Sequence, residues 1–203
     1  MSKTNTFAVI LLLSTALSPG AARAGLTETS SPTHVLGGAA DSDPDQEADR
    51  RLFAVFRATQ LSLSQVMEIA EKLHNGSRSA DIRFETSGSP TYRVRTVKND
   101  RVWENVIDAS TGRVADKEIA SSLKELDRDD LGNIIALRSV RQELADAVRV
   151  AERAASGRAL SGGLQKEEGH LSFVVLVLSG DQLKEVSLEP PSVHRQGSGH
   201  RAR

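Results

Sequence analysis

In the first half of the chain, apolar residues have helical spacing in two segments, residues 44–57 and 63–73. In both segments the large apolar side chains recur three and four positions apart, which is the pattern of a helix that buries one face. Ser62 and Gln65 have the spacing of a capping box at the start of the second helix. Gly76 suits the left-handed conformation that follows a helix C-terminus. The pattern therefore predicts two amphipathic helices in succession.

The period then changes from helical to alternating, which predicts strands. Polar and apolar residues alternate in three segments separated by short turns, as they do in half-exposed strands. The segments are residues 81–85, 92–97 and 102–107. Consecutive strands joined by short turns predict an antiparallel meander, with one face covered by the second helix and the other exposed to water. We therefore expect an α+β fold.

The same plan recurs later in the chain at a constant shift of 81 positions, without a gap from the first helix to the third strand. Matched positions keep the helix face, the glycine after the helix and the aromatic start of the second strand. They include Phe53 with Ile134, Arg57 with Arg138, Leu63 with Leu144, Gly76 with Gly157, Tyr92 with Phe173 and Glu104 with Glu185. The repeat predicts two tandem helix-plus-sheet units.

The second copy differs from the first in its strands. Residues 160–168 lack the alternation of polar and apolar residues, so the pattern does not predict a first strand in this copy. Residues 173–178 are apolar on both faces, where the first copy carries Arg93 and Arg95. A strand of this kind is usually covered on both sides. Either the first unit covers it, or it is an exposed patch that awaits a partner.

The N-terminus resembles a processing segment. Residues 7–17 are mostly apolar, Pro19-Gly20 interrupts them, and Ala22-Arg23-Ala24 has small residues where a signal peptidase cleaves. The apolar run is too short to span a bilayer, which takes about 20 residues. We predict a signal peptide cleaved after Ala24 and a periplasmic or secreted protein; the alternative is a retained N-terminal anchor.

Composition narrows the class of protein further. Removal of Lys3 and Arg23 with the signal peptide leaves 24 basic and 27 acidic side chains, which disfavours general nucleic-acid binding. The chain has no cysteine, so no disulfide stabilises it. Burial alone must hold the fold.

A resemblance to a known family rests on three motifs: Ser64–Glu71 in the second helix, a Tyr-x-Val strand at Tyr92, and Val106–Val114 with its Asp-Ala-Ser-Thr-Gly turn. Together these residues resemble a PepSY domain over residues 62–114. In the second copy Glu189–Val193 replaces the turn, so that copy is degenerate. The resemblance implies a helix on an antiparallel sheet and a non-catalytic module that acts on peptidases or other partners outside the cytoplasm. The tandem arrangement also resembles that of secreted inhibitor proteins.

The predicted organisation follows from these observations. It consists of a signal peptide (1–24), a disordered linker (25–43), a PepSY-like domain (44–115), a helical connector (116–129), a degenerate PepSY-like repeat (130–190) and a disordered tail (191–203).

Four residues on adjacent strands are the candidates for binding a protein partner: Arg93, Arg95, Trp103 and Glu104. Trp and Arg contribute disproportionately to binding energy at interfaces. The alternative is that Trp103 lies in the core and that the arginines pair with Glu85 and Glu104 across strands.

Other chemistry has little support. We interpret Asp108 and Gly112 as a structural turn, since such an aspartate bonds nearby backbone N–H groups. The alternating acids Asp41, Asp43 and Asp45 begin like a calcium loop, but Pro44 interrupts them and Leu52 stands where the loop needs a glutamate. None of the five histidines, His34, His74, His170, His194 and His200, lies in a catalytic motif.

The sequence thus predicts a non-catalytic periplasmic module that modulates a peptidase or another cell-envelope protein, with no metal and no cofactor. The alternative is a periplasmic protein that binds a small ligand or a metal. A hydrolase has the least support, because no Gly-x-Ser-x-Gly motif is present.

Overall fold

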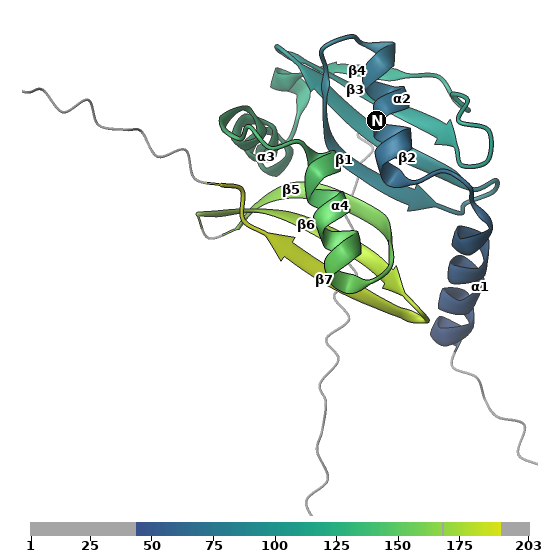
Figure 1. The fold of residues 1–203 in the computed structure, drawn as a ribbon. Coiled ribbons are helices and arrows are strands. Elements are labelled where there is room, and N and C mark those ends of the chain that lie inside the picture. The colour runs from purple at the N-terminus through teal and green to yellow at the C-terminus, as the bar shows by residue number, and fades with distance from the viewer. Residues whose placement is uncertain (1–43, 168, 192–203) are drawn as a thin grey trace, which may run out of the picture. The chain divides into compact units, whose positions relative to one another are not determined.

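The computed structural model describes residues 44–167 and 169–191 (Figure 1). The predicted signal peptide, the linker and most of the tail lie outside the described residues. In the calcium-like loop, Asp41 and Asp43 lie outside them, and the side chain of Asp45 is not described. In the described chain, four α-helices and seven strands confirm the α+β prediction. Their bounds are α1 Pro44–Ala58, α2 Leu63–Leu73, β1 Arg78–Glu85, β2 Thr91–Lys98, β3 Arg101–Asp108, β4 Ile119–Ser122, η1 Leu123–Glu125, α3 Arg128–Ser139, α4 Leu144–Ala155, β5 Arg158–Glu167, β6 His170–Ser179 and β7 Gln182–Leu188.

Helix α2 begins where its capping signals predict. The Ser62 side chain accepts a hydrogen bond from the backbone N–H of Gln65, and the Gln65 side chain bonds the backbone N–H of Ser62. This reciprocal pair satisfies two N–H groups that have no partner within the helix. Gly76 follows the helix end with a φ of 83°. The local signals are therefore sufficient to define both ends of α2.

The seven strands form one continuous antiparallel sheet in the order β4-β3-β2-β1-β5-β6-β7. Strands β1 and β5 pair at its centre, where Asp81, Ile82 and Arg83 lie opposite Gly163, Gly162 and Ser161. Helices α2 and α4 lie on the same face of this sheet (Figure 1). The two halves of the chain are thus joined edge to edge through their first strands.

Strand β5 corrects one expectation, because residues 158–167 form a full strand despite their irregular pattern. It is held by pairing with β1 on one side and β6 on the other. Its glycines fit close contacts on both faces. A Cβ on Gly162 would lie 3.3 Å from Val148 of α4, and one on Gly163 would lie 3.2 Å from the Cβ of Asp81.

The order helix, helix and three strands occurs twice, and the spacing between the copies is not constant. Tyr92 and Phe173 correspond at a shift of 81, but their strand partners Phe84 and Leu164 correspond at 80. Both first strands carry a bulge at the same place, between Ser79 and Asp81 in β1 and between Ala159 and Ser161 in β5. The prediction of a gap-free match is therefore wrong over this strand.

The predicted helical connector is also wrong. Residues 119–122 form strand β4, which pairs with β3, and residues 123–125 form the short 3-10 helix η1. Helix α3 starts only after the N-cap residue Asp127, whose side chain accepts a hydrogen bond from the N–H of Asp130. A charged composition is compatible with both structures, and pairing with β3 decides between them.

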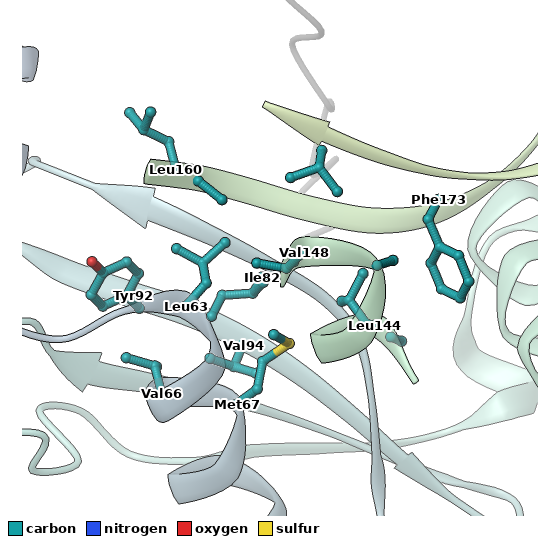
Figure 2. Packing of buried hydrophobic residues seen from close by; sticks show 14 of the residues in the cluster. Leu63, Val66, Met67, Ile82, Tyr92, Val94, Leu144, Val148, Leu160 and Phe173 are labelled. Atoms are coloured by element: carbon teal, nitrogen blue, oxygen red, sulfur yellow. The ribbon is translucent and has the colours of Figure 1, made fainter. Parts of the chain in front are cut away.

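One hydrophobic cluster serves both halves. Side chains from α2 and the first strands, such as Leu63, Met67 and Ile82, belong to the same buried cluster as Leu144 and Val148 of α4 (Figure 2). All five are 1% exposed or less. Since burial contributes about 25 cal/mol per Å² of apolar surface, the shared cluster couples the stability of the two halves.

Arginine side chains connect the halves reciprocally. Arg78 of β1 donates hydrogen bonds to the carbonyls of Leu137, Val140 and Gln142, which link α3 to α4. Arg158 of β5 donates to the carbonyls of Thr59 and Leu61, which link α1 to α2. Each half thereby stabilises the helix connection of the other.

A second reciprocal pair involves the hairpins. Arg57 of α1 bonds the carbonyl of Gly180 and the carboxylate of Asp181, in the β6–β7 turn. Arg138 of α3 bonds the carbonyl of Asn99 and the carboxylate of Asp100, in the β2–β3 turn. These residues correspond at a shift of 81, so the contacts obey the internal symmetry.

Strand β6 is buried mainly on the face toward α4, and on its other face Leu178 alone among the described residues of the strand is buried. Phe173, Val175 and Val177 are fully buried toward α4, whereas Val174 and Leu176 on the other face are only partly buried. The strands of the first half lie in the same sheet as β6 and are separated from it by β5. The strands of the first half therefore do not stack on the second face of this strand.

Candidate functional site

The Asp108–Gly112 turn is closed by its own aspartate. Asp108 Oδ1 accepts hydrogen bonds from the N–H groups of Ser110 and Thr111, at 3.0 and 2.7 Å, and from the Thr111 hydroxyl at 2.8 Å. These bonds lower the pKa of Asp108 because they favour the charged carboxylate. Gly112 has a φ of 70°, a conformation that suits glycine. The geometry fits a structural turn.

The face of the sheet opposite α2 carries a network of charged side chains in the first half. Arg93 of β2 lies at its centre. Its guanidinium bonds Glu85 of β1 at 2.9 and 3.0 Å, and Glu104 of β3 at 2.6 Å. Because three strands supply these groups, the pairs also fix the strands side by side. We call the exposed surface around Arg93, Glu85, Glu104 and Arg83 the charged face.

Arg95 lies on the same side but is buried. Only 8% of the residue is exposed, and its guanidinium pairs with Asp81 at 3.2 Å and with Asp130 at 2.8 Å. Asp130 comes from the first turn of α3, 35 positions further along the chain. Burial of such a charge is tolerated only with close partners of opposite charge. Arg95 thus anchors α3 to the sheet and is not available to a partner.

Asp81 is the titratable group most affected by this arrangement. Burial raises its pKa from 3.8 to about 6, and the guanidinium groups of Arg95 and Arg83 oppose that rise. In contrast, hydrogen bonds from Arg93 and Arg83 outweigh burial at Glu85 and lower its pKa. This side of the sheet therefore combines Asp81, which is protonated more readily than usual, with Glu85, which is protonated less readily.

This difference predicts a dependence of stability on pH. A carboxyl group whose pKa is higher in the folded state binds more protons when folded, so its contribution to stability falls as pH rises from about 4 to about 6. The full displacement corresponds to about 3 kcal/mol. Because 31% of the Asp81 side chain is exposed, we expect about 1–2 kcal/mol. Urea unfolding at pH 4.5 and pH 7 should therefore show that Asp81→Asn gains this amount relative to wild type at the higher pH. Parallel stability curves for the two proteins would contradict the interpretation.

Trp103 lies on the opposite face from the charged network. It stands across from Thr96, on the side of the sheet that α2 covers. Its ring stacks on His74 at the end of α2, with centroids 4.0 Å apart and an angle of 13°. His74 Nε2 in turn lies 2.7 Å from a carboxylate oxygen of Glu118. The stack therefore links the helix end, β3 and the segment before β4.

The structure thus brings together three of the four predicted partner-binding residues, Arg93, Arg95 and Glu104, and separates Trp103 from them. Adjacent residues of a strand point to opposite faces, so Trp103 and Glu104 could not have formed one surface. Sequence analysis missed Asp81, Asp130, His74 and Glu118. Alternation along β1 would have placed Asp81 beside Arg95, whereas no local signal connects Asp130 to β2.

Three buried polar side chains beneath α2 have unpaired atoms. The Oγ of Ser79, the Oγ1 of Thr96 and both amide atoms of Asn105 have no hydrogen-bond partner among the described residues. All three residues are at most 2% exposed. Ser79 and Thr96 lie directly opposite each other on β1 and β2.

No group of three or more potential metal ligands occurs within residues 44–167 and 169–191. Asp127 is the N-cap residue of α3, and Asp129 and Asp130 lie in the first turn of that helix. Asp41 and Asp43 are not among the described residues. In the same part of the chain no helix is long and apolar enough to cross a membrane.

Comparison with known proteins matches one segment of the chain to a family model. Residues 60–118 match the family model of the PepSY domain, described as a peptidase propeptide and YPEB domain. Among solved structures, a candidate lipoprotein of Clostridium difficile 630 matches with 14% identity and a TM-score of 0.39, covering 67% of this chain and 90% of that one. Comparison with curated proteins produced no match. The matched segment contains α2, β1–β3 and the Asp108–Gly112 turn, which are the elements and the turn on which the resemblance rests. Residues 60–118 of this chain are therefore similar to a PepSY domain.

Proposed function

We propose that this chain is a non-catalytic, extracytoplasmic PepSY-type module that binds and modulates a peptidase or another cell-envelope protein. The observation that carries the proposal is the match of residues 60–118 to a family described by its peptidase propeptides. The signal-like residues 1–24 support a setting outside the cytoplasm.

The charged face is the surface that we assign to this partner. Arg83, Glu85, Arg93 and Glu104 retain 17–37% side-chain exposure, and the described helices α2 and α4 lie on the other side of the sheet. Ion pairs already orient these side chains, so a partner would not have to order them. A polar face of this kind favours a specific, complementary surface over nonspecific association.

The chemistry of the described residues is consistent with binding rather than catalysis. His74 contacts Trp103 and Glu118, and neither is a nucleophile that an imidazole could activate. Asp108 is engaged by its own turn. The proposal therefore rests on surface recognition.

The test is crosslinking in intact periplasm with wild type, Arg93→Gln and Arg149→Gln. Arg93→Gln removes charge from the charged face, whereas Arg149→Gln is the matched control on α4, where Arg149 pairs with Asp146 at 54% side-chain exposure. We expect wild type and Arg149→Gln to capture the same protein, and Arg93→Gln to capture at least tenfold less.

Folding of each variant is checked by its thermal unfolding midpoint. Failure of wild type to enrich any protein would overturn the proposed function. Equal capture by a folded Arg93→Gln variant would show that the charged face is not the surface that binds the partner. Trp103→Phe, on the other side of the sheet, should leave capture unchanged.

A further inference from the structure

The two ends of the sheet differ in whether another segment of the chain pairs with the outer strand. The outer edge of β3 is covered by the chain that follows it. Ala115 donates to the carbonyl of Val106 at 2.7 Å, Asp108 donates to the carbonyl of Arg113 at 2.8 Å, and β4 continues the pairing. Strand β7 ends the sheet at the other side, and within the described residues no strand lies along its outer edge.

Internal symmetry identifies the backbone groups on this open edge. Strands β3 and β7 correspond at a shift of 81, because Ile107 lies opposite Tyr92 and Leu188 lies opposite Phe173. The groups that bond the covering segment belong to Val106 and Asp108 in β3 and to Asp100 just before it. Since backbone groups alternate in direction along a strand, the outward groups of β7 are those of Leu183, Glu185 and Ser187.

The open edge has neither a bulge nor a proline that would interrupt pairing with another strand. Strand β7 pairs with β6 at seven consecutive positions without a bulge, and it contains no proline. A lysine often protects such an edge. Here the ammonium group of Lys184 donates hydrogen bonds to the carbonyl of Ala155 and the hydroxyl of Ser179, on the side away from the open edge. The backbone of β7 is therefore in the right conformation to accept another strand.

Charge indicates what kind of strand would fit. Glu185 corresponds to Glu104, which pairs with Arg93 in the first half. In the second half Val174 and Leu176 replace the arginines, and Glu185 lies across from Leu176. Glu185 is exposed, and no ion pair forms to it within the described residues. A basic side chain on an added strand would supply the missing charge.

We propose that the outer edge of β7 is a strand-addition site, which binds an extended segment of a partner protein antiparallel to β7 with a basic residue facing Glu185. This mode of binding draws its affinity from backbone hydrogen bonds and its selectivity from side chains. The covering segment of β3 is the internal precedent for the geometry. The inference rests on the proposed function, for which it names a second surface.

The first test uses a synthetic peptide with the sequence of residues 113–122, in which lysine replaces the isoleucine that corresponds to Ile119. Ile119 lies across from Glu104, so the lysine should face Glu185. We expect millimolar peptide to slow amide hydrogen exchange at Leu183, Glu185 and Ser187 at least tenfold. The unmodified sequence should bind two- to fivefold more weakly at low salt.

Two variants separate the backbone from the side chain. Glu185→Pro removes an outward N–H without touching the bonds to β6, a position at which an edge strand tolerates proline. Glu185→Ala keeps the N–H and removes only the carboxylate. We expect Glu185→Pro to lose the peptide and Glu185→Ala to retain binding at the level of the unmodified sequence. Unchanged exchange of the β6 amides shows that each variant is folded.

Several outcomes would overturn the inference. The first is that the peptide does not slow amide exchange in β7. The second is that Glu185→Pro and Glu185→Ala bind the peptide equally well. Protection without peptide that disappears in a chain ending at Pro191 would assign the edge to residues 192–203 instead. Protection that grows with protein concentration would assign it to a second copy. A partner captured in periplasm without peptide protection at β7 would refute this surface and leave the proposed function intact.

Discussion

Replacing Gly157 with alanine is expected to lower the free energy of unfolding by about 2–4 kcal/mol. A Cβ at this position would lie 2.3 Å from the carbonyl oxygen of Leu178 and 2.8 Å from Cγ1 of Val177. The oxygen belongs to the backbone of β6, which pairs with Arg158 at this point. It cannot move without disturbing the ladder between β5 and β6. Urea unfolding monitored by the fluorescence of Trp103, the single tryptophan, measures the loss.

Gly132→Ala is the matched control. Gly132 lies inside α3, and a Cβ there would meet no atom within 4 Å. Alanine is favoured over glycine in a helix interior by about 1 kcal/mol, so this variant should be more stable than wild type. A Gly157→Ala protein as stable as wild type would show that the backbone around Leu178 yields easily.

Arg78→Met is the second substitution with a large expected effect. It removes hydrogen bonds to the carbonyls of Leu137, Val140 and Gln142, and the ion pair with Glu143. The three carbonyls would lose a charged donor at a site where the Arg78 side chain is only 27% exposed. Bonds to a charged donor contribute about 1.5–3 kcal/mol each, and partial solvation replaces some of them. We expect the variant to lose about 2–4 kcal/mol of stability.

Methionine preserves the apolar length of the arginine, so packing is not the variable tested. Arg51→Met is the control, since Arg51 makes an exposed pair with Glu47 at 78% side-chain exposure. Such pairs contribute less than about 1 kcal/mol. Similar effects of the two substitutions, measured by urea unfolding, would mean that the Arg78 bonds are replaced by water at little cost.

Local signals predicted much of the fold. Ser62 and Gln65 defined the start of α2 because a capping box acts within four residues. A short turn was also predicted between residues 97 and 102, and in it Asn99 has the positive φ, 52°, that such turns require. Features of this kind depend on neighbours in the sequence and can be recognised without a structure.

Strands β4 and β5 could not be predicted because distant partners stabilise them. Residues 158–167 contain two adjacent glycines, which disfavour a strand in isolation. They form a strand here because β1 and β6 pair with them on either side. Glycine is needed at these positions because Val148 and Asp81 leave little room for larger side chains. The one-residue change in repeat spacing is hidden for the same reason, since only the strand register reveals it.

The candidate site was predicted in part. Alternation placed Arg93 and Arg95 on the face away from Tyr92, and the predicted pairs of Arg93 with Glu85 and Glu104 are present. The same alternation should have excluded Trp103 from that face. The pairing of Arg95 with Asp130 depends on where α3 lies, and that information is not contained in either segment alone.

The pairing of β1 with β5 has a consequence for the order in which this protein folds. The two strands are about 80 residues apart in the chain, and such distant pairing slows folding because a long loop must close first. During synthesis or export the first half would emerge with one edge of β1 uncovered, and an uncovered edge invites association with other chains. Folding of both halves is thus expected to be a single late event. A chain interrupted before β5 should aggregate rather than persist as half a protein.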